Sequence, residues 1–330
     1  MTERRALVTG IGGQDGSLLA ELLLAEGYEV FGVVRRSAPS YPNLAEIRDR
    51  VELIQADLND QLALVRALRT CRPQEVYNLA SVSFVPMSWE QPVLTAELAA
   101  VGATALLEAI REVDPATRFY QASSSEIFGE PVETPQSEET SLAPLTPYGV
   151  AKAYAHFITR SYRRRFWFHS SAGILYNHES PRRPVEFLPS KVANAVASNK
   201  LGLIGELWLG DLSAQRDWGY AGDYVRAMWL ILQQDEPADY VIASGVLHSV
   251  EELVQCAFDH VGLDWREYVH VDESLKRGKA ELHNLVGNPA KARDRLGWSP
   301  EVSFDELVAL LVDAELERLG RELQPEQSSR

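Results

Sequence analysis

Residues 5–16 read Arg5-Ala6-Leu7-Val8-Thr9-Gly10-Ile11-Gly12-Gly13-Gln14-Asp15-Gly16, a short apolar strand that runs into a glycine-rich turn. The amphipathic stretch from Ser17 to Glu26 then predicts a helix that Gly27 ends. Residues without a β-carbon allow the tight turn, the close approach of backbone to a pyrophosphate and the packing of helix on strand. Such turns also occur in unrelated loops, but the position between a strand and a helix indicates dinucleotide binding. The contacts expected from this turn are Gly10, Gly13, Gln14, Asp15 and Gly16.

The second predicted strand, residues 28–34, ends at two arginines, Arg35 and Arg36. Folds that prefer NAD usually have an acid near this point, which holds the adenosine ribose hydroxyls. Two guanidinium groups suit a 2′-phosphate instead, so we expect NADP(H) as the cofactor. The alternative is a basic turn exposed to solvent.

Strands and helices alternate along the first half of the chain. Strands are expected at 51–55, 75–79 and 118–122, with helices at 60–69 and 92–113. This order predicts an α/β fold, a doubly wound parallel Rossmann sheet with its ligand at the carboxyl ends of the strands. Further cofactor contacts are then expected from the ends of the third and fourth strands, at Asp57, Leu58, Leu79 and Ala80. Asp57 is placed either to contact the adenine edge or to cap the following helix.

The pattern changes after a sixth strand at 167–175. We expect residues 1–176 to form mainly the NADP-binding domain, to which some later segments return, and 177–320 mainly a smaller α/β lobe for substrate. Residues 321–330 are expected to be a disordered tail. Later elements are expected at 187–198, 207–210, 223–232, 240–243, 250–261, 268–271, 289–296 and 304–319. Cationic groups concentrate in this part of an acidic chain, as a diphosphate-binding cleft requires: Arg182, Arg183, Lys191 and Arg216.

Composition excludes several classes of partner. A net charge of −15 over 330 residues argues against a surface that coats nucleic acid. No uninterrupted apolar run reaches the ~18 residues of a membrane span, and the N-terminus lacks a signal-peptide pattern. The two cysteines, Cys71 and Cys256, have no metal-type spacing and are expected to be reduced thiols in the cytoplasm, with no metal site.

A second stretch, residues 119–152, carries the chemistry. If the extended backbone of the fifth strand continues past Ser123, Ser124 and Glu126 project to the same side. Thr146 is a natural helix N-cap, so Tyr148 and Lys152 fall at i and i+4 on one helical face. The ammonium is expected to lower the pKa of the phenol toward working pH and make it a base. A Tyr-x-x-x-Lys spacing alone occurs by chance in many helices; its order after the serine cluster and the glycine-rich turn favours catalysis.

With these residues, the chain resembles the extended short-chain dehydrogenase/reductases, and within them the GDP-mannose 4,6-dehydratases. The likeness runs from Ala6 to about Trp298, and its most discriminating segment is Asn177-His178-Glu179-Ser180-Pro181-Arg182-Arg183. Other segments that carry it are 10–17, 34–37, 119–123 and 215–219. The resemblance implies an NADP-dependent lyase of nucleotide-sugar metabolism, with a GDP-hexose as the favoured substrate.

The resemblance also implies a role for each residue. Tyr148, assisted by Lys152, would take the proton of the sugar 4-hydroxyl while hydride leaves C4, and Ser124 would hold O4. Glu126 would abstract the C5 proton and help to expel the C6 hydroxyl as water, which gives a 4-keto-6-deoxy sugar. Substrate contacts are implied for Ser83, Ser125, Asn177, Arg183, Lys191 and Arg216.

Two departures from the family pattern affect substrate and assembly. Gly278-Lys279-Ala280-Glu281 stands where an Arg-Pro-Ala-Glu run is common, so an arginine near the diphosphate is absent or displaced to Arg277. Residues 37–50 are shorter than the loop that forms tetramers in the family, so both a homodimer and a homotetramer stay open.

Three alternative functions remain at this stage. A nucleotide-sugar 4-epimerase shares the serine and the Tyr-Lys pair, but generally lacks a carboxylate at the position of Glu126. A dehydratase acting on another nucleotide sugar is also compatible. A non-enzymatic NADP sensor is disfavoured because such proteins tend to lose the Tyr-Lys pair.

Overall fold

The computed structural model describes residues 4–35, 40–203, 205–275 and 285–323. Its larger part is a seven-stranded parallel sheet in the order β11-β6-β5-β4-β1-β2-β3. The strand order reverses at β1, as in a doubly wound fold. The strands are β1 (Arg4–Thr9), β2 (Tyr28–Val34), β3 (Val51–Gln55), β4 (Glu75–Asn78), β5 (Arg118–Ser124), β6 (Ser170–Leu175) and β11 (Asp239–Ile242).

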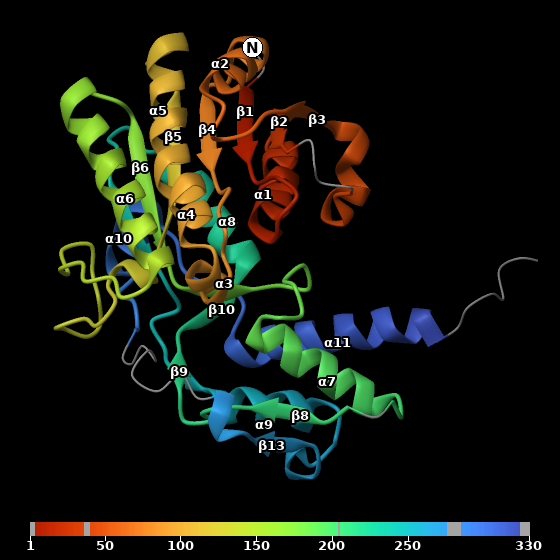
Figure 1. Cartoon of the computed structure of the whole chain (residues 1–330). Coiled ribbons are helices and arrows are strands. Elements are labelled where there is room, and N and C mark those ends of the chain that lie inside the picture. Colours follow the sequence, from red (N-terminus) through yellow and green to blue (C-terminus); the bar gives the residue numbers. More distant parts are fainter. Residues whose placement is uncertain (1–3, 36–39, 204, 276–284, 324–330) are drawn as a thin grey trace, which may run out of the picture.

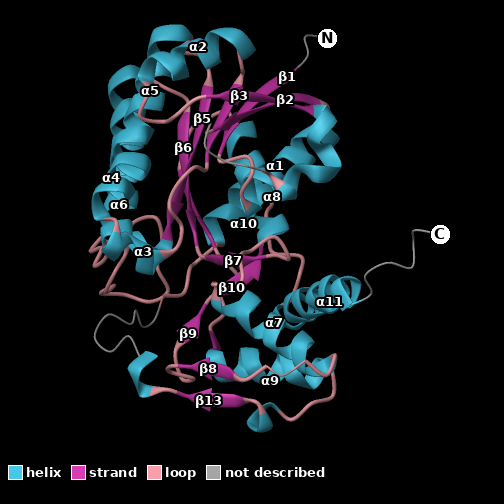
Figure 2. Ribbon diagram, turned by 45° about the vertical axis from the view of Figure 1, so that its right-hand side comes forward, coloured by secondary structure: helices cyan, strands magenta, loops and turns pink. Residues whose placement is uncertain are grey.

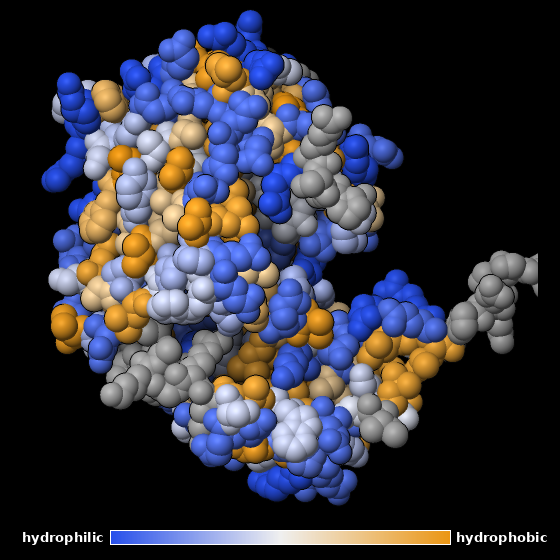
Figure 3. Space-filling model, in the orientation of Figure 1, coloured by the Kyte–Doolittle hydropathy of each residue, from blue (hydrophilic) through white to orange (hydrophobic). Residues whose placement is uncertain are grey.

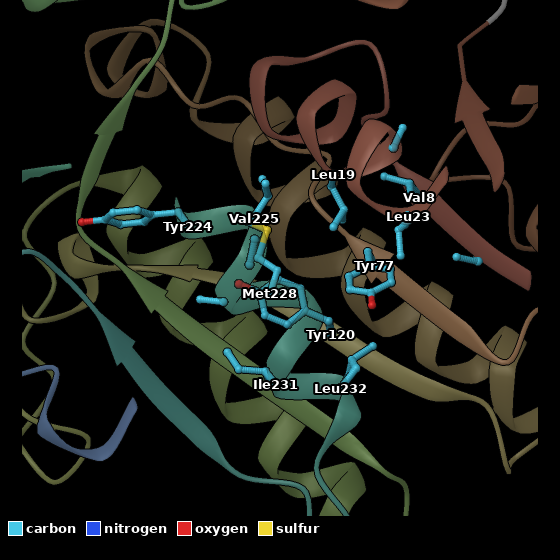
Figure 4. Packing of buried hydrophobic residues seen from close by; sticks show 14 of the residues in the cluster. Val8, Leu19, Leu23, Tyr77, Tyr120, Tyr224, Val225, Met228, Ile231 and Leu232 are labelled. Carbon is cyan, nitrogen blue, oxygen red and sulfur yellow. The ribbon is translucent and has the colours of Figure 1, made fainter. Parts of the chain in front are cut away.

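Helices cover both faces of this sheet (Figure 2). One face carries α2 (Gln61–Cys71), α5 (Gly102–Val113) and α6 (Pro147–Phe166). The other carries α1 (Gln14–Ala25), α8 (Ala221–Gln233) and α10 (Ala290–Leu296). Figure 4 shows the second of these interfaces, in which Leu19 and Leu23 of α1 and Met228 of α8 pack toward Tyr77 and Tyr120 of the sheet. Burial of these side chains holds α8, which comes late in the sequence, against the first strands.

A smaller lobe lies beyond the carboxyl ends of the strands (Figure 1). It has a hydrophobic core of its own, built mainly from three helices and two short strand pairs. The pairs are β8 with β13 and β9 with β12, and a third pair, β7 with β10, lies between this lobe and the sheet. The elements are α7 (Leu188–Lys200), α9 (Val250–His260), α11 (Phe304–Leu323), β7 (Asn177–Glu179), β8 (Leu207–Leu209), β9 (Gln215–Arg216), β10 (Trp218–Tyr220), β12 (His248–Ser249) and β13 (Val269–Val271).

The helix predicted at 92–113 is continuous but not uniform. It is α4 (Pro92–Ala96), a π-helical turn η2 (Glu97–Val101) and then α5. This span is also long and apolar enough, by length and composition alone, to cross a membrane, although half of the tested window is buried inside the protein. Short elements complete the fold: η1 (Pro42–Arg50), α3 (Val85–Glu90), η3 (Ser125–Ile127), η4 (Trp265–Glu267) and η5 (Glu273–Leu275).

Three predicted boundaries are wrong by three residues or more. Helix α1 begins at Gln14 rather than Ser17, because Gly13 takes the extended N-cap conformation three residues earlier. Strand β6 begins at Ser170 rather than at residue 167, since Trp167 has a left-handed conformation (φ 60°) that ends α6. Helix α11 continues to Leu323, so residues 321–323 belong to a helix rather than to the predicted tail. The rest of that tail, residues 324–330, lies outside the described residues.

Candidate active site

A cavity of about 500 Å³ lies between the carboxyl ends of the strands and the smaller lobe. The sheet contributes the residues that follow β4, β5 and β6 to its lining, including Leu79 and Ser123–Glu126. The smaller lobe contributes Lys191 and Arg216. The cavity therefore brings the predicted catalytic and substrate residues together with two of the predicted cofactor residues, Asp15 and Leu79, as expected for a ligand at this edge of a doubly wound sheet.

The glycine-rich turn has the geometry that a dinucleotide phosphate requires. Gly10 has a positive φ of 71°, and a β-carbon there would lie 3.0 Å from the Ala80 backbone. A β-carbon on Gly16 would overlap the Gly10 carbonyl oxygen, so helix α1 can pack this closely only with glycine. The N-cap of α1, Gly13, has no side-chain hydrogen bond to the helix. Free N–H groups of a first helical turn bind anions well.

One further observation fits a cofactor. The Ser123 hydroxyl is buried, lines the cavity and has no hydrogen-bond partner among the described residues. Leu79 lines the same cavity, and Ala80 lies against Gly10. These residues fit the predicted contact with a dinucleotide at this end of the sheet.

The adenosine end is predicted at Arg35, Arg36, Asp57 and Leu58. Arg35 and Asp57 line a second cavity, between the ends of β2 and β3 and helix α2. Asp57 accepts a hydrogen bond from Asn59 N (2.9 Å), whereas the cap of α2 is Asp60. Asp57 is therefore not the helix cap. The Leu58 side chain is buried in the core, and Arg36 lies outside the described residues.

The catalytic residues meet where β5 ends. The strand stops at Ser124, and Glu126 lies in the turn η3, so the extended backbone does not continue to Glu126. This turn forms because Ser124 Oγ accepts a hydrogen bond from Glu126 N (3.3 Å). Thr146 caps α6 through Gly149 N (2.9 Å), as predicted, and Tyr148 lines the cavity together with Ser124.

The predicted pKa of Tyr148 is wrong for the ligand-free protein. Burial raises the pKa of Tyr148 to about 12, and the hydrogen bond with Ser124 offsets only part of this effect. Burial also lowers the pKa of Lys152 to about 8. The Lys152 ammonium lies 5.6 Å from the Tyr148 ring centroid and donates to the Ala122 carbonyl oxygen (3.0 Å). Desolvation therefore dominates both pKa shifts.

The predicted substrate residues line the same cavity: Ser83, Ser125, Asn177, Arg183, Lys191 and Arg216. Arg183 pairs with the buried Glu179 (3.3 Å) and lies over the Phe187 ring (3.7 Å). Lys191 Nζ donates to the Trp208 carbonyl oxygen (2.8 Å). These contacts fix two cations on the side of the cavity that faces the smaller lobe.

Arg182 does not belong to this group of cations. It donates to Ser17 Oγ (2.9 Å) and Glu21 Oε1 (2.6 Å) on helix α1. Arg182 therefore joins its segment to helix α1, and its charge is already paired with Glu21. The departure at residues 278–281, with Arg277, lies outside the described residues.

His178 is a residue of the cavity to which the sequence pattern assigns no role. Its imidazole lines the cavity and pairs with Asp15 (2.9 Å). Its position inside segment 177–183, the most discriminating part of the family resemblance, is the feature of the sequence that could have indicated a role in the site. Trp208, which lines the cavity and is 46% exposed, carried no such signal.

The family model for GDP-mannose 4,6 dehydratase matches residues 7–311. The chain belongs to this family. The relative named GDP-mannose 4,6 dehydratase 2, from Arabidopsis thaliana, is 46% identical over 334 residues, a match that covers 96% of this chain and 88% of the relative. The GDP-mannose 4,6-dehydratase family is thus established over nearly the whole chain, as the sequence resemblance predicts.

Solved structures related to this family member share its whole architecture. The dTDP-glucose 4,6-dehydratase DesIV from Streptomyces venezuelae, with NAD and TYD bound, has a TM-score of 0.85 at 26% identity, covering 96% of this chain and 98% of that chain. The UDP-glucose 4-epimerase from Thermotoga maritima, with UDP-glucose, has a TM-score of 0.85 at 25% identity, covering 96% of this chain and 99% of that chain. Dehydratases and epimerases therefore share this fold, and the residues in the cavity must distinguish them.

Proposed function

We propose that this protein is a GDP-mannose 4,6-dehydratase, a hydro-lyase that forms GDP-4-keto-6-deoxymannose. The observation that carries the proposal is one cavity lined by Ser124, Tyr148 and Lys152 together with a carboxylate, Glu126. The first three suit redox chemistry at a sugar carbinol, and the carboxylate suits proton abstraction at the next carbon. Family membership supports the choice of substrate.

The residues divide the reaction between two bases. Tyr148 accepts the proton of the 4-hydroxyl, and Ser124 holds O4 by a hydrogen bond. Glu126 takes the C5 proton, made acidic by the new 4-keto group, and protonates the C6 hydroxyl, which leaves as water. The proton that Tyr148 accepted balances the one that C5 regains when hydride returns to C6. Bound NADP⁺ supplies the acceptor for hydride from C4, the donor that returns it to C6, and a positive ring charge that favours the Tyr148 phenolate.

NADP(H) is the proposed cofactor rather than NAD(H). Arg35 lies at the end of β2, where a guanidinium group would pair with a 2′-phosphate, and it lines the cavity that contains Asp57. Replacing Arg35 and Arg36 by alanine should weaken NADP⁺ binding much more than NAD⁺ binding, measured by calorimetry. Equal losses would mean that the pair is only a basic turn.

The reaction is tested by mass spectrometry of the purified protein after separate incubation with GDP-, UDP-, CDP- and dTDP-hexoses. Loss of one water from GDP-mannose alone is the expected result. Loss of water from another nucleotide sugar would change the substrate but retain the chemistry. An unchanged mass with a new sugar isomer would make the protein a 4-epimerase, a class that shares its fold.

We further propose that the protein is a homo-oligomer, a dimer or a tetramer. Apolar side chains gather over α4, α5 and α6 (Figure 3), and the exposed ones include Val93, Val101, Val150, Tyr154 and Phe157. Helices α5 and α6 lie side by side, with Thr104 Oγ1 of α5 donating to the Tyr154 hydroxyl of α6 (3.2 Å). A second copy in two-fold symmetry can cover this face with the same face of its own.

Light scattering tests this assembly. Phe157→Asp, at a side chain that is 51% exposed, should shift the protein toward monomers because it leaves a charge inside the interface. Val132→Asp is the matched control, since Val132 is 88% exposed on a loop outside α4, α5 and α6. A wild-type monomer, or an unchanged mass for Phe157→Asp, would contradict the proposal.

A cytoplasmic location is proposed as well. Cys71 and Cys256 are both free thiols, a usage typical of reducing compartments. Fractionation of cells that express the full chain should recover it with the cytoplasmic enzymes. Recovery with membranes would point instead to the apolar span at 92–113.

A further inference from the structure

Side chains of the first turn of α1 hold the segment that leads into the smaller lobe. Gln14 Nε2 donates to the His178 carbonyl oxygen (3.1 Å), and Ser180 Oγ donates to Gln14 Oε1 (2.9 Å). Gln14 Nε2 also donates to Asp15 Oδ1 (3.0 Å), which fixes the carboxylate beside it. Two side chains expected to serve the cofactor therefore act on the opposite wall of the cavity.

The central contact joins His178 to Asp15. His178 Nε2 lies 2.9 Å from Asp15 Oδ2, and His178 Nδ1 lies 2.7 Å from the Tyr176 carbonyl oxygen. A carbonyl oxygen can only accept a hydrogen bond, and so can an ionised carboxylate. Both ring nitrogens must then carry hydrogen, so the imidazole is positively charged. The ring is also stacked on Tyr224 (4.7 Å between centroids), which fixes its plane.

The same helical turn offers its backbone to an anion. The N-cap Gly13 leaves the first N–H groups of α1 without a side-chain partner, and such groups bind phosphate. Asp15 and His178 line the cavity together with Asn177 and Arg183, the neighbours that His178 positions along the chain. The first turn of α1 thus offers its backbone N–H groups to a cofactor phosphate. Its side chain Asp15 lines the cavity in which the nucleotide sugar is proposed to bind.

We propose that the Asp15–His178 ion pair is a latch that couples the two ligand sites, so that a bound dinucleotide strengthens binding of the nucleotide sugar, and the reverse. This inference rests on the proposed function, which supplies both ligands. A phosphate that fixes the first turn of α1 fixes Asp15, and a fixed Asp15 holds His178 and the segment beside it in one position. The second ligand then loses less conformational freedom on binding.

The charges around His178 make the latch dependent on pH. The groups that face it are Asp15 on α1, Glu179 and Arg183 on its own segment, and the Tyr224 ring on α8. Burial alone would lower the pKa of His178, but Asp15 outweighs burial and raises it. The pair is therefore complete below the ordinary histidine value and is lost as pH rises through the raised pKa. Burial opposes ionisation of Asp15, yet His178 holds its pKa well below the usual range, so the carboxylate stays charged throughout.

Calorimetry of GDP binding, with and without saturating NADP⁺, measures the coupling directly. The wild-type protein should bind GDP about 10-fold more tightly with NADP⁺ present, within the usual range of coupling between sites. In Asp15→Asn the ratio should fall to within about 2-fold of unity, because the amide carries no charge to hold the imidazolium. Asp313→Asn is the matched control, because it removes a His–Asp contact of similar length (2.8 Å, to His260) on the surface of the smaller lobe. That variant should keep the wild-type ratio.

A second measurement needs no variant. The wild-type ratio should decrease between pH 6 and pH 9, while the affinity for each ligand alone changes less. A ratio near unity at every pH, or an unchanged ratio in Asp15→Asn, would overturn the latch. Failure of the wild-type protein to bind either ligand would overturn the proposed function instead, so the two failures are distinguishable.

Discussion

We propose that Glu126 is the residue that separates elimination from epimerisation in this cavity. In Glu126→Gln, proton transfer from C5 should stop, and kcat should fall by about 10²- to 10⁴-fold, as expected for loss of a general base. Reduction of bound NADP⁺ at C4 should persist, because Ser124, Tyr148 and Lys152 are intact. Product mass and absorbance of the reduced nicotinamide measure the two steps. Glu130→Gln, an exposed neighbour, is the control, and near-normal dehydration by Glu126→Gln would exclude this role.

We expect Lys152 to lower the stability of the folded protein while it supports activity. Its folded pKa of about 8 lies below the ordinary value of 10.5, so burial of its charge opposes folding below pH 8. Lys152→Met should therefore raise the free energy of unfolding by about 1 kcal/mol at pH 7 and abolish activity. The gain should shrink as pH rises from 8 toward 10.5, since the unfolded lysine then loses its proton too. A lower melting temperature for the variant at pH 7 would show that the bond to the Ala122 carbonyl matters more.

Sequence spacing predicted which residues meet in the cavity, but not their energies. The i, i+4 spacing brought Tyr148 and Lys152 together because helix geometry is local. Their pKa values depend on desolvation by distant segments, and no local pattern encodes it. The partner of His178 was equally hidden, since it comes from 163 residues earlier in the chain.

At the scale of elements, the close packing of α1 on β1 depends on Gly16. Gly16→Ala should shift the turn, since a β-carbon would overlap the Gly10 carbonyl oxygen, and should destabilise the protein by about 1–3 kcal/mol. NADP⁺ affinity should fall with it, because the same turn holds the phosphate. Gly320→Ala in α11 is the control, as a β-carbon there meets nothing within 4 Å. Thermal unfolding and calorimetry check both variants, and normal NADP⁺ affinity in Gly16→Ala would contradict the phosphate role of the turn.

The strand and helix order was predictable because hydrophobic period and turn residues are local signals. The predicted element boundaries are wrong where the local backbone conformation depends on packing against distant segments. Ser124 turns the chain by accepting from Glu126 N, so β5 ends at Ser124 and Glu126 lies in the turn that follows. Trp167 ends helix α6 in a left-handed conformation, which is usually adopted by glycine at this position.

At the scale of the molecule, one buried carboxylate, Asp217, joins the strand segment of β9 and β10 to the residues that follow β11. The sheet domain and the smaller lobe bury separate clusters, and the cavity lies between them. Asp217 follows Arg216, which lines the cavity, and is itself fully buried. It accepts hydrogen bonds from Ser244 N (2.8 Å) and Gly245 N (2.9 Å), just after β11 of the sheet. These hydrogen bonds of Asp217, which form a joint between the smaller lobe and the sheet, are therefore next to Arg216, a predicted substrate residue.

Asp217→Asn should weaken this joint. One carboxylate oxygen accepts from Ser244 N and its hydroxyl, and the other accepts from Gly245 N and Gly287 N (3.2 Å). An amide keeps only one acceptor and directs its NH₂ at two donors, so we expect a loss of about 2–4 kcal/mol in the free energy of unfolding. GDP affinity should fall as well, because Arg216 moves with the joint. Calorimetry checks both quantities, with Asp264→Asn, an exposed turn carboxylate that accepts from Arg266 N, as the control. Lower stability with unchanged GDP affinity would mean that Asp217 supports the fold without positioning Arg216.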